Sequence, residues 1–269
     1  MKKMGMKKYI LILFILGAFS FVSDGWKSIY SIKKKCDFFT TDNIGNLYFV
    51  QGDEIKKFNP SGELLKVYSN KKLGRITSID ASNPLRVLVF YKDFAQLIFL
   101  DSQLSQNGES ISLENMLLEQ SDLACNSFNN GVWLYNRQNA ELVRLDDNLI
   151  KVVSTGNLNR LLNTELHPNF LMEHNEFVYL NNVSEGIFVF DIYGTYYKTI
   201  PVKGTKSFQL RDNELFYYSE NKFNVYNTKL LSTNFLPLKD SAIVQMRAEK
   251  NRYYLQYTDS LVVSEIEKK

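Results

Sequence analysis

The residues that most often carry enzyme chemistry are few and scattered in this sequence. The chain of 269 residues has two histidines, His167 and His174, and two cysteines, Cys36 and Cys125. His167 precedes a proline and His174 precedes a predicted turn, so neither lies in a spacing typical of a zinc site. No serine lies in a G-x-S-x-G motif, neither cysteine has a convincing general base nearby, and glycine-rich phosphate loops are missing. The sequence therefore gives no support to nucleophilic, zinc or nucleotide chemistry, and we expect no cofactor.

The element that must position any functional side chain is a repeat of short strands. A turn containing asparagine recurs along the chain at spacings of 40, 47, 45, 38 and 38 residues. These turn residues are Asn43, Asn83, Asn130, Asn175, Asn213 and Asn251. A second polar marker follows each of the first five turns, at Asn59, Asp101, Asp146, Asp191 and Asn227. A period of roughly 40–45 residues is typical of one four-stranded blade of a β-propeller.

The two ends of the repeat indicate how a ring of blades closes. Each unit alternates apolar and polar residues over short runs, as half-buried strands do. The sixth unit ends one strand short, after residues 260–266, while residues 25–32 form a strand-like segment ahead of the first unit. We predict an all-β, six-bladed β-propeller of four-stranded blades whose sixth blade is closed by this N-terminal strand, because an unpaired edge invites aggregation. The irregular third unit is where a miscount is most expected.

The same register bears on the two cysteines. It places Cys36 and Cys125 on the innermost strands of the first and third blades, with another sheet between them. A disulfide needs Cα atoms within about 7 Å. We therefore expect two free, buried thiols that behave as small hydrophobes.

The first 20 residues have the features of an export signal. Four lysines (Lys2, Lys3, Lys7 and Lys8) precede an apolar run from Tyr9 to Leu16, and residues 18–20 suit cleavage. We expect residues 1–20 to be removed and residues 21–269 to form a single propeller domain, exported to the periplasm or associated with the outer envelope. The run is shorter than the roughly 20 residues of a spanning helix, so we expect no membrane-spanning segment in the mature chain. The alternative is a retained anchor, because apolar character continues to Val22.

Charge excludes one class of partner. The formal charge is +3, but loss of residues 1–20 leaves 28 basic against 29 acidic residues. A nearly neutral protein lacks the basic surface on which nucleic-acid affinity depends. We expect no nucleic-acid partner.

The best-formed units resemble a known family. Residues 41–50, with the turn Asp42-Asn43-Ile44-Gly45-Asn46, and residues 55–64 resemble a blade of the NHL-type six-bladed propellers. Residues 191–194 repeat the second half of that pattern, so the resemblance covers the first and fourth units. The Asn and Arg that this family has between the two strands are missing at residues 51–53. The resemblance implies a fold and no activity, since that fold hosts enzymes, receptors and scaffolds.

Enzymes related to this family suggest an alternative function. The lactonase-like hydrolases hold a divalent metal at the channel mouth through a Glu on the first inner strand and Asn and Asp from other blades. Here that strand begins Cys36-Asp37-Phe38 without a Glu, which leaves Asp37, Asp122 and Asn126 as candidate ligands. The alternative is thus a metal-dependent propeller hydrolase or lyase. We expect these residues to cap turns or contact water instead, and assign no catalytic or metal residue.

The surface loops offer more than the strands. Loops that enter the inner strands gather on one face of a propeller, where a rigid scaffold positions them. Several are basic, and such a rim would attract an acidic surface, although lysines in turns are also ordinary solvated residues. Residues 113–123 and 154–169 are longer than a turn needs and contain apolar residues, the second at the spacing of a short amphipathic helix. Such residues either pack back onto the blade or dock a partner.

The function hypothesis follows from these loops. We expect a non-enzymatic, exported propeller that serves as a protein-binding or scaffold module in the cell envelope, for a partner with an acidic surface. Its predicted partner-binding residues are Lys71, Lys72, Arg75, Met116, Leu117, Leu158, Arg160, Leu161 and Leu162. A further alternative is glycan binding through aromatic side chains such as Trp133 or Tyr135, although strand aromatics usually belong to the core.

Overall fold

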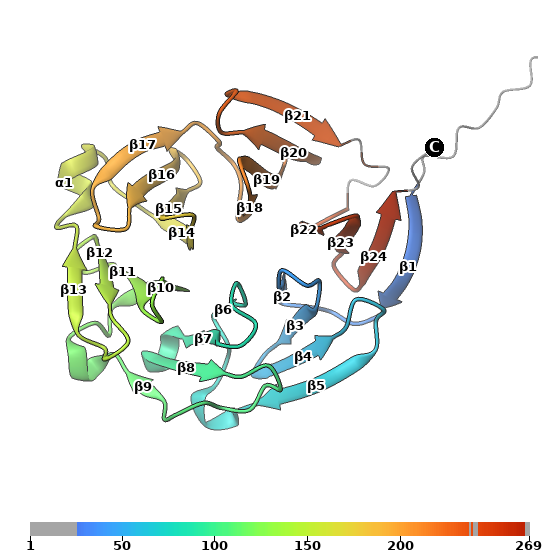
Figure 1. The fold of residues 1–269 in the computed structure, drawn as a ribbon, viewed down its shortest axis with the longest axis horizontal. Coiled ribbons are helices and arrows are strands. Elements are labelled where there is room, and N and C mark those ends of the chain that lie inside the picture. Colours follow the sequence, from blue (N-terminus) through green and yellow to red (C-terminus); the bar gives the residue numbers. More distant parts are fainter. Residues whose placement is uncertain (1–25, 237, 239–241, 267–269) are drawn as a thin grey trace, which may run out of the picture.

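The computed structural model describes residues 26–236, 238 and 242–266, and these form a ring of six blades around a central channel (Figure 1). Each blade is an antiparallel sheet of four strands, with its first strand beside the channel and its last at the rim. The predicted fold class is confirmed. The predicted export signal, residues 1–20, lies outside the described residues. Within the described part of the chain, no helix is long and apolar enough to cross a membrane.

The strands follow the repeat of the sequence. From the channel outward the blades are β2 (Phe38–Thr41), β3 (Leu47–Gln51), β4 (Glu54–Phe58), β5 (Leu64–Ser69); β6 (Ser78–Asp80), β7 (Val87–Tyr91), β8 (Gln96–Leu100), β9 (Ile111–Ser112); β10 (Ser121–Asn126), β11 (Val132–Asn136), β12 (Glu141–Leu145), β13 (Lys151–Ser154); β14 (Pro168–His174), β15 (Phe177–Asn182), β16 (Gly186–Asp191), β17 (Tyr196–Ile200); β18 (Phe208–Arg211), β19 (Glu214–Ser219), β20 (Lys222–Asn227), β21 (Ser232–Leu236); and β22 (Gln245–Glu249), β23 (Arg252–Gln256), β24 (Leu261–Ile266), β1 (Trp26–Ile32). We number the blades 1 to 6 in this order. The third unit, where a miscount was most expected, is a regular blade. The irregularity lies in blade 2, whose outer strand β9 is two residues long.

The second sequence marker is a turn cap between the third and fourth strands. In blade 3, Oδ1 of Asp146 accepts hydrogen bonds from the backbone N–H groups of Asn148 (3.0 Å) and Ile150 (2.8 Å). Asn59, Asp101 and Asp191 bond the residues two and four places later in the same way. Short polar side chains that satisfy nearby backbone groups favour such turns. The marker therefore recurs because each hairpin needs the same side-chain acceptor.

The same turn explains why only two units resemble the family pattern. The residue three places after the cap has a left-handed backbone in each of these four blades. It is Gly62 (φ 90°) and Gly194 (φ 82°) in blades 1 and 4, but Leu104 (φ 59°) and Leu149 (φ 63°) in blades 2 and 3. Glycine adopts this conformation without the steric cost that a Cβ brings. The turn geometry is thus common to all four blades, and the glycine is not.

The turn Asp42–Asn46 is held by the Asp side chain. Oδ1 of Asp42 accepts from the backbone N–H of Ile44 (3.1 Å) and Asn46 (2.9 Å). Its Oδ2 accepts from Nδ2 of Asn46 (2.8 Å) and from the hydroxyl of Tyr48 (3.2 Å). Gly45 has φ 90°, and its carbonyl accepts a hydrogen bond from Tyr254 of blade 6 at 2.7 Å. This motif therefore shapes a turn and also joins the first blade to the last.

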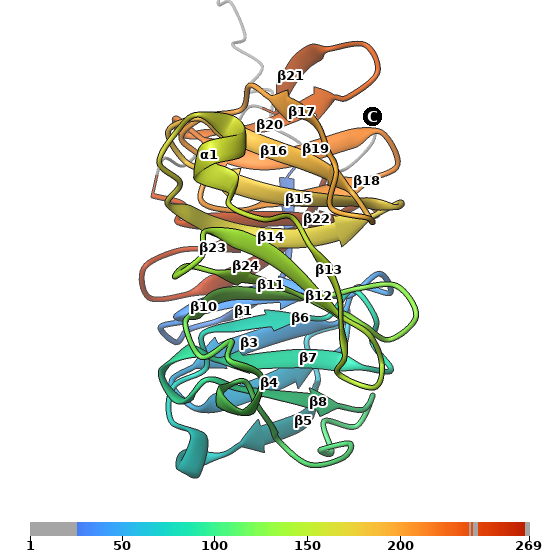
Figure 2. The same cartoon turned by 90° about the vertical axis from the view of Figure 1, so that its left-hand side faces the viewer.

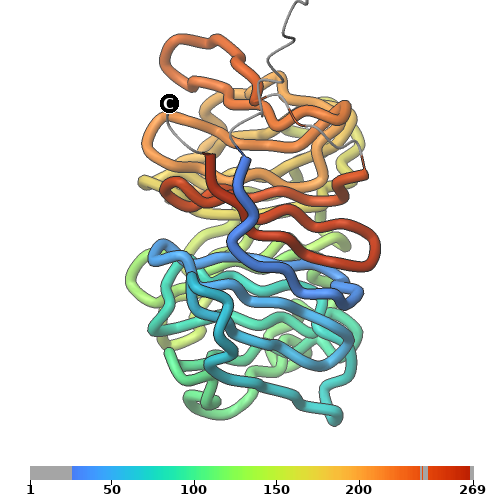
Figure 3. The backbone as a smooth tube through the Cα atoms, turned by 90° about the vertical axis from the view of Figure 1, so that its right-hand side faces the viewer, coloured from blue at the N-terminus to red at the C-terminus, as the bar shows by residue number. Residues whose placement is uncertain are grey.

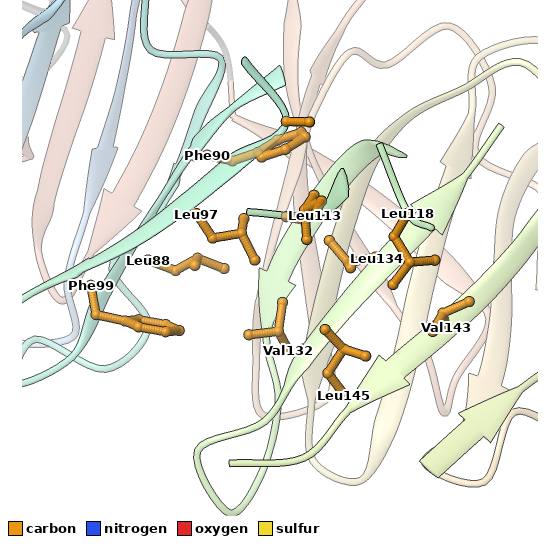
Figure 4. Close-up of a cluster of buried hydrophobic side chains, with 12 residues drawn as sticks. Leu88, Phe90, Leu97, Phe99, Leu113, Leu118, Val132, Leu134, Val143 and Leu145 are labelled. Carbon is orange, nitrogen blue, oxygen red and sulfur yellow. The ribbon is translucent and has the colours of Figure 1, made fainter. Parts of the chain in front are cut away.

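The hydrophobic core lies between the blades. The described residues form six buried clusters, and each joins one pair of neighbouring blades. Figure 4 shows the cluster between blades 2 and 3, where Leu88, Leu97 and Phe99 face Val132 and Leu145. Figure 2 shows the sheets packed face to face along the ring. Since neighbouring sheets share each cluster, a blade has a core on both faces only when the ring is closed.

Closure is made by the N-terminal strand, as predicted. Strand β1 pairs antiparallel with β24, from Trp26 opposite Ile266 to Ile32 opposite Leu261, with a bulge between Ser28 and Tyr30. Figure 3 shows the two strands side by side at the rim. Across the seam to blade 1, Tyr30 and Ile32 pack against the cluster that contains Phe39 and Val263. Gln256 also donates from Nε2 to the carbonyl of Cys36 at 2.9 Å.

Gly62 provides a test of this seam. A Cβ on Gly62 would lie 2.6 Å from the Tyr30 ring, whereas one on Gly108 would meet nothing within 4 Å, and both residues have positive φ. We expect Gly62→Ala to lower the free energy of unfolding by about 1–3 kcal/mol more than Gly108→Ala. Only the alanine at position 62 would push the aromatic ring of Tyr30 out of its packed position. Urea unfolding measures both. Equal losses would show that the Tyr30 contact contributes nothing to closure.

The cysteines provide a second test. Both are free and buried, as predicted. Burial raises the pKa of the Cys36 thiol to about 12 and that of Cys125 well above its ordinary value. A thiol reagent should therefore react slowly with the native protein throughout the mildly alkaline range, where a free thiol of pKa about 8.5 becomes thiolate. After denaturation both should react at once. Fast native reaction of either thiol would contradict the register of its blade.

Candidate functional site

The loops divide between two faces of the ring because the strands of each blade alternate in direction. One face carries the connectors between blades and the turns between second and third strands, and we call it the connector face. Its connectors are residues 33–37, 70–77, 113–120, 155–167 and 201–207. The opposite face carries the turns between third and fourth strands, and we call it the turn face. The predicted partner-binding residues all belong to connectors of the first face.

The predicted basic residues lie on the connector from blade 1 to blade 2. Lys71 and Lys72 belong to the short 3-10 helix η1 (Lys71–Leu73), where Asn70 accepts the backbone N–H of Lys72 at 3.1 Å. Both lysines are exposed. Arg75 is exposed too, but its Nη2 lies 3.1 Å from Oδ1 of Asp37 in an ion pair. Acidic side chains thus neutralise part of the expected basic rim.

The next blade shows the same balance. Asp122, at the start of β10, is paired with Lys92 at 2.8 Å and lies 3.5 Å from Nε of Arg137. The connector face therefore has mixed charge. Its exposed cations include Lys71 and Lys72, of which Lys71 interacts with Asp53, and Arg160.

The longest connector forms the predicted helix and packs back onto its blade. Helix α1 (Leu158–Leu162) begins after Asn157, whose side chain accepts the backbone N–H of Arg160 at 2.9 Å. Leu158 is fully buried and Leu162 partly buried in the cluster between blades 3 and 4. Leu161 is 54% exposed. This corrects the place of Leu158 among the partner-binding residues, because its side chain is part of the core and cannot be reached from outside.

The connector from blade 2 to blade 3 divides its apolar residues in the same way. Leu113 and Leu118 are buried, and Met116 packs against the cluster between these blades. Leu117 follows the 3-10 helix η3 (Glu114–Met116), has φ 56° and is 82% exposed. Apart from Leu158, four apolar residues were predicted to contact a partner. Leu117 and Leu161 are exposed, whereas Met116 and Leu162 are half-buried.

The connectors 113–120 and 155–167 both form hydrogen bonds with one turn of blade 3, residues 137–140. The backbone N–H of Arg137 donates to the carbonyl of Gln120 at 3.0 Å, and its guanidinium donates to the side chain of Gln120 at 2.9 Å. From the other side, Leu158 donates its N–H to the carbonyl of Ala140 at 2.7 Å. Residues 113–120, 137–140 and 155–167 therefore form one continuous surface, which we call the loop ledge. The two long loops were predicted from the sequence, but the turn 137–140 that joins them was not.

The central channel has polar side chains of β22, Gln245 and Arg247, among apolar ones such as Phe38, Ile79 and Phe170. A cavity of about 710 Å³ opens at the connector face, and a second of about 130 Å³ lies deeper. Arg247 lines both; its Nε donates to Thr41 at 2.9 Å, and its Nη2 lies 4.0 Å from Oε1 of Glu249. Burial lowers the pKa of the Arg247 guanidinium, and Glu249 opposes that effect. Glu249 also accepts from Thr41 (2.6 Å) and Gln209 (2.5 Å), so these groups join blades 5, 6 and 1.

The candidate metal ligands do not converge. Asp37 bonds Gly52 and Arg75, Asp122 pairs with Lys92, and Asn126 bonds Asp80 and Arg86. Asp122 and Asn126 lie near opposite ends of β10, roughly 13 Å apart at the rise of a strand. Among the described residues, no group of three or more His, Cys, Asp or Glu side chains could hold a metal ion.

The aromatic residues suggested for glycan binding belong to the core. Trp133 and Tyr135 are buried in the cluster between blades 3 and 4. The indole Nε1 of Trp133 donates to Glu173 at 2.8 Å. Their alternation on β11 gives no free face, because neighbouring blades cover both sides of the sheet. Glycan binding through these two residues is therefore wrong.

Comparison with known proteins establishes the fold. No protein-family model matches the sequence, and no curated protein matches it. The WD40 domain of Pan2 from Neurospora crassa has a TM-score of 0.63 at 9% identity, over 92% of this chain and 97% of that one. Virginiamycin B lyase from Staphylococcus aureus has a TM-score of 0.57 at 12% identity, over 85% and 80%. BamB from Moraxella catarrhalis has a TM-score of 0.56 at 11% identity, over 91% and 98%. The chain is similar to all three in fold alone.

Helix α1 allows the division between core and surface to be tested. We expect Leu158→Ala to lower the free energy of unfolding by about 2–4 kcal/mol, because it leaves a cavity in the cluster between blades 3 and 4. Leu161→Ala, which changes an exposed residue of the same helix, should change the free energy of unfolding by less than about 0.5 kcal/mol. Thermal or urea unfolding gives both values. A small loss for Leu158→Ala would mean that α1 is not docked.

Proposed function

We propose that this protein is a non-enzymatic binding module of the cell envelope, and that it holds a partner protein on the loop ledge. The observation that carries the proposal is the pair of exposed leucines, Leu117 and Leu161, which project from two connectors braced on one turn. Large apolar side chains held out on rigid loops favour a docking role. The signal-like residues 1–20 support export.

The backbone conformation of Leu117 supports the loop ledge as the binding site. Leucine with φ 56° is uncommon, because its Cβ crowds the preceding carbonyl in the left-handed conformation. In Leu104 the same conformation is combined with burial, which offsets its cost. Leu117 gains no such burial at 82% exposure. A partner that covers this side chain would supply the missing contact.

Charge describes the partner further. Arg137 and Arg160 border the two leucines, and Lys71 and Lys72 lie exposed one connector away. Charged groups at the rim of an interface steer association and fix orientation more than they add affinity. The proposed partner has an apolar centre and an acidic border. Glu114 and Glu119, on the connector 113–120, give the ledge some negative charge as well. The preference for an acidic partner surface therefore applies only near Arg137 and Arg160.

Two considerations favour binding over catalysis. The charged groups of the channel are bonded to one another across the seam of blades 5, 6 and 1, so they serve the ring itself. The acidic residues that could form a hydrolase site are likewise engaged in separate contacts. Leu117 and Leu161 lie on the ledge, outside the channel, which supports a surface partner.

The test is capture of the partner by a tagged protein from its own envelope fraction. We expect Leu117→Ser combined with Leu161→Ser to reduce capture at least about tenfold, because a few residues near the centre of an interface carry most of its binding energy. The matched control is Leu85→Ser combined with Ile150→Ser on the turn face, which removes two comparably exposed apolar side chains elsewhere. Undiminished capture by the first variant, with unchanged folding, would reject the ledge as the site.

A further inference from the structure

The turn face is not uniform around the ring. The turn between third and fourth strands is polar in blade 1 and has a buried leucine, Leu104, in blade 2, while in blade 3 it exposes Ile150 (60%). In blades 4 and 5 the same turns present apolar tips. Tyr193 is 75% exposed in blade 4, and Leu230 and Leu231 are 75% and 68% exposed in blade 5.

In blade 4 the strand that follows the turn extends the apolar surface, as the start of β5 does in blade 1 with Leu64 and Leu65. Tyr196 and Tyr197 begin β17 directly after the turn of blade 4, and both are exposed. We call Tyr193, Tyr196, Tyr197, Leu230 and Leu231 the tyrosine–leucine patch. Leu231 has φ 53°, so this leucine too is held outward in an unfavourable backbone conformation. Tyrosine and leucine together are typical of groups that meet the interface of a lipid bilayer.

A basic groove separates the two tips. It has a volume of about 200 Å³, and its lining includes Tyr197, Lys198, Lys229, His174 and Asp212. The ammonium of Lys198 lies 5.5 Å from the centre of the Tyr197 ring. Asp212 is the acidic residue in the lining of this groove. Two lysines between apolar tips suit a phosphate headgroup, with the apolar side chains entering the acyl boundary.

The path of the chain leads to the same face. In blade 5 the third strand ends at Asn227 and the fourth begins at Ser232, both on the turn face. In blade 6 the corresponding ends are Ile266 of β24 and Trp26 of β1, which pair with each other. Trp26 also packs beside the cluster between blades 5 and 6. Residues 1–25, with their apolar run from Tyr9 to Leu16, therefore join the ring on the turn face beside blade 5.

We propose that the tyrosine–leucine patch docks the ring on a bilayer containing anionic phospholipid, with the groove between blades 4 and 5 receiving headgroup phosphate. The patch lies on the face where the N-terminal segment leaves the ring, so a chain exported at a membrane is delivered with this face toward the lipid. The connector face then points away from the bilayer. This orientation would leave the loop ledge accessible, although the docking itself does not depend on the proposed function.

Vesicle sedimentation tests the proposal with residues 21–269, since residues 26–266 contain every strand of the six blades. We expect binding to vesicles of phosphatidylethanolamine mixed with phosphatidylglycerol, and weaker binding to phosphatidylcholine alone. Leu230→Ser combined with Leu231→Ser should weaken binding at least about tenfold. Lys198→Gln and Lys229→Gln should each weaken it about fivefold, with the loss confined to anionic vesicles.

Matched variants on the other face complete the design. Leu117→Ser combined with Leu161→Ser, and Lys71→Gln combined with Lys72→Gln, should leave vesicle binding unchanged. The proposal is overturned if no vesicle binds, if these controls lose as much as the patch variants, or if inorganic phosphate alone competes fully. It is also overturned if the leucine pair on blade 5 proves to mediate a dimer in sedimentation velocity. Loss of partner capture with retained vesicle binding, or the reverse, separates this proposal from the proposed function.

Discussion

The pairing of β1 with β24 is the interaction on which the rest of this structure depends. Every hydrophobic cluster of the described ring lies between two blades, and no blade encloses a core of its own. A four-stranded sheet with one face uncovered would leave large apolar surface in water. The strand pair fixes the last blade to the first, so that each sheet is covered on both faces. The contacts of Tyr254 with Gly45 and of Arg247 with Thr41 then make the seam as specific as the other joints.

The buried clusters between blades stabilise the ring, so its connectors can differ in length and in the residues that they expose. The connectors 113–120 and 155–167 insert a few leucines into the clusters beneath them, and this anchoring holds the remaining leucines outward. Leu113 and Leu118 fix Leu117 in this way, as Leu158 and Leu166 fix Leu161. On the turn face, the capping side chains Asp191 and Asn227 hold Tyr193 and Leu230 in the same manner. In these four loops, the exposed apolar side chain lies beside residues that fix the backbone.

The sequence predicted those features that a single local interaction determines. Asp101, Asp146 and Asp191 mark their turns because each carboxylate satisfies the same two backbone groups, and the missing fourth strand followed from counting these turns. Burial was harder to predict, since it depends on a neighbouring blade. Four leucines in 154–169 indicate a helix but not that Leu158 faces the cluster, and alternation on β11 suggests an exposed Trp133 although both faces are covered. The ledge was not predicted, because it depends on where two separate connectors contact the turn 137–140, through Gln120 on one side and Leu158 on the other.

The order of the strands along the chain has a consequence for how the protein is made. Of the described strands, β1, which closes the ring, is synthesised first, and its partner β24 is synthesised last. Blades 1 to 5 can form in succession as synthesis proceeds, yet β1 has no partner until all of them have been made. Its edge must stay soluble during that interval, which suits a seven-residue strand that carries Lys27 and two serines on exposed or half-exposed positions. Nascent chains that stop before residue 261 lack the partner strand, so the ring can close only after all six blades have been synthesised.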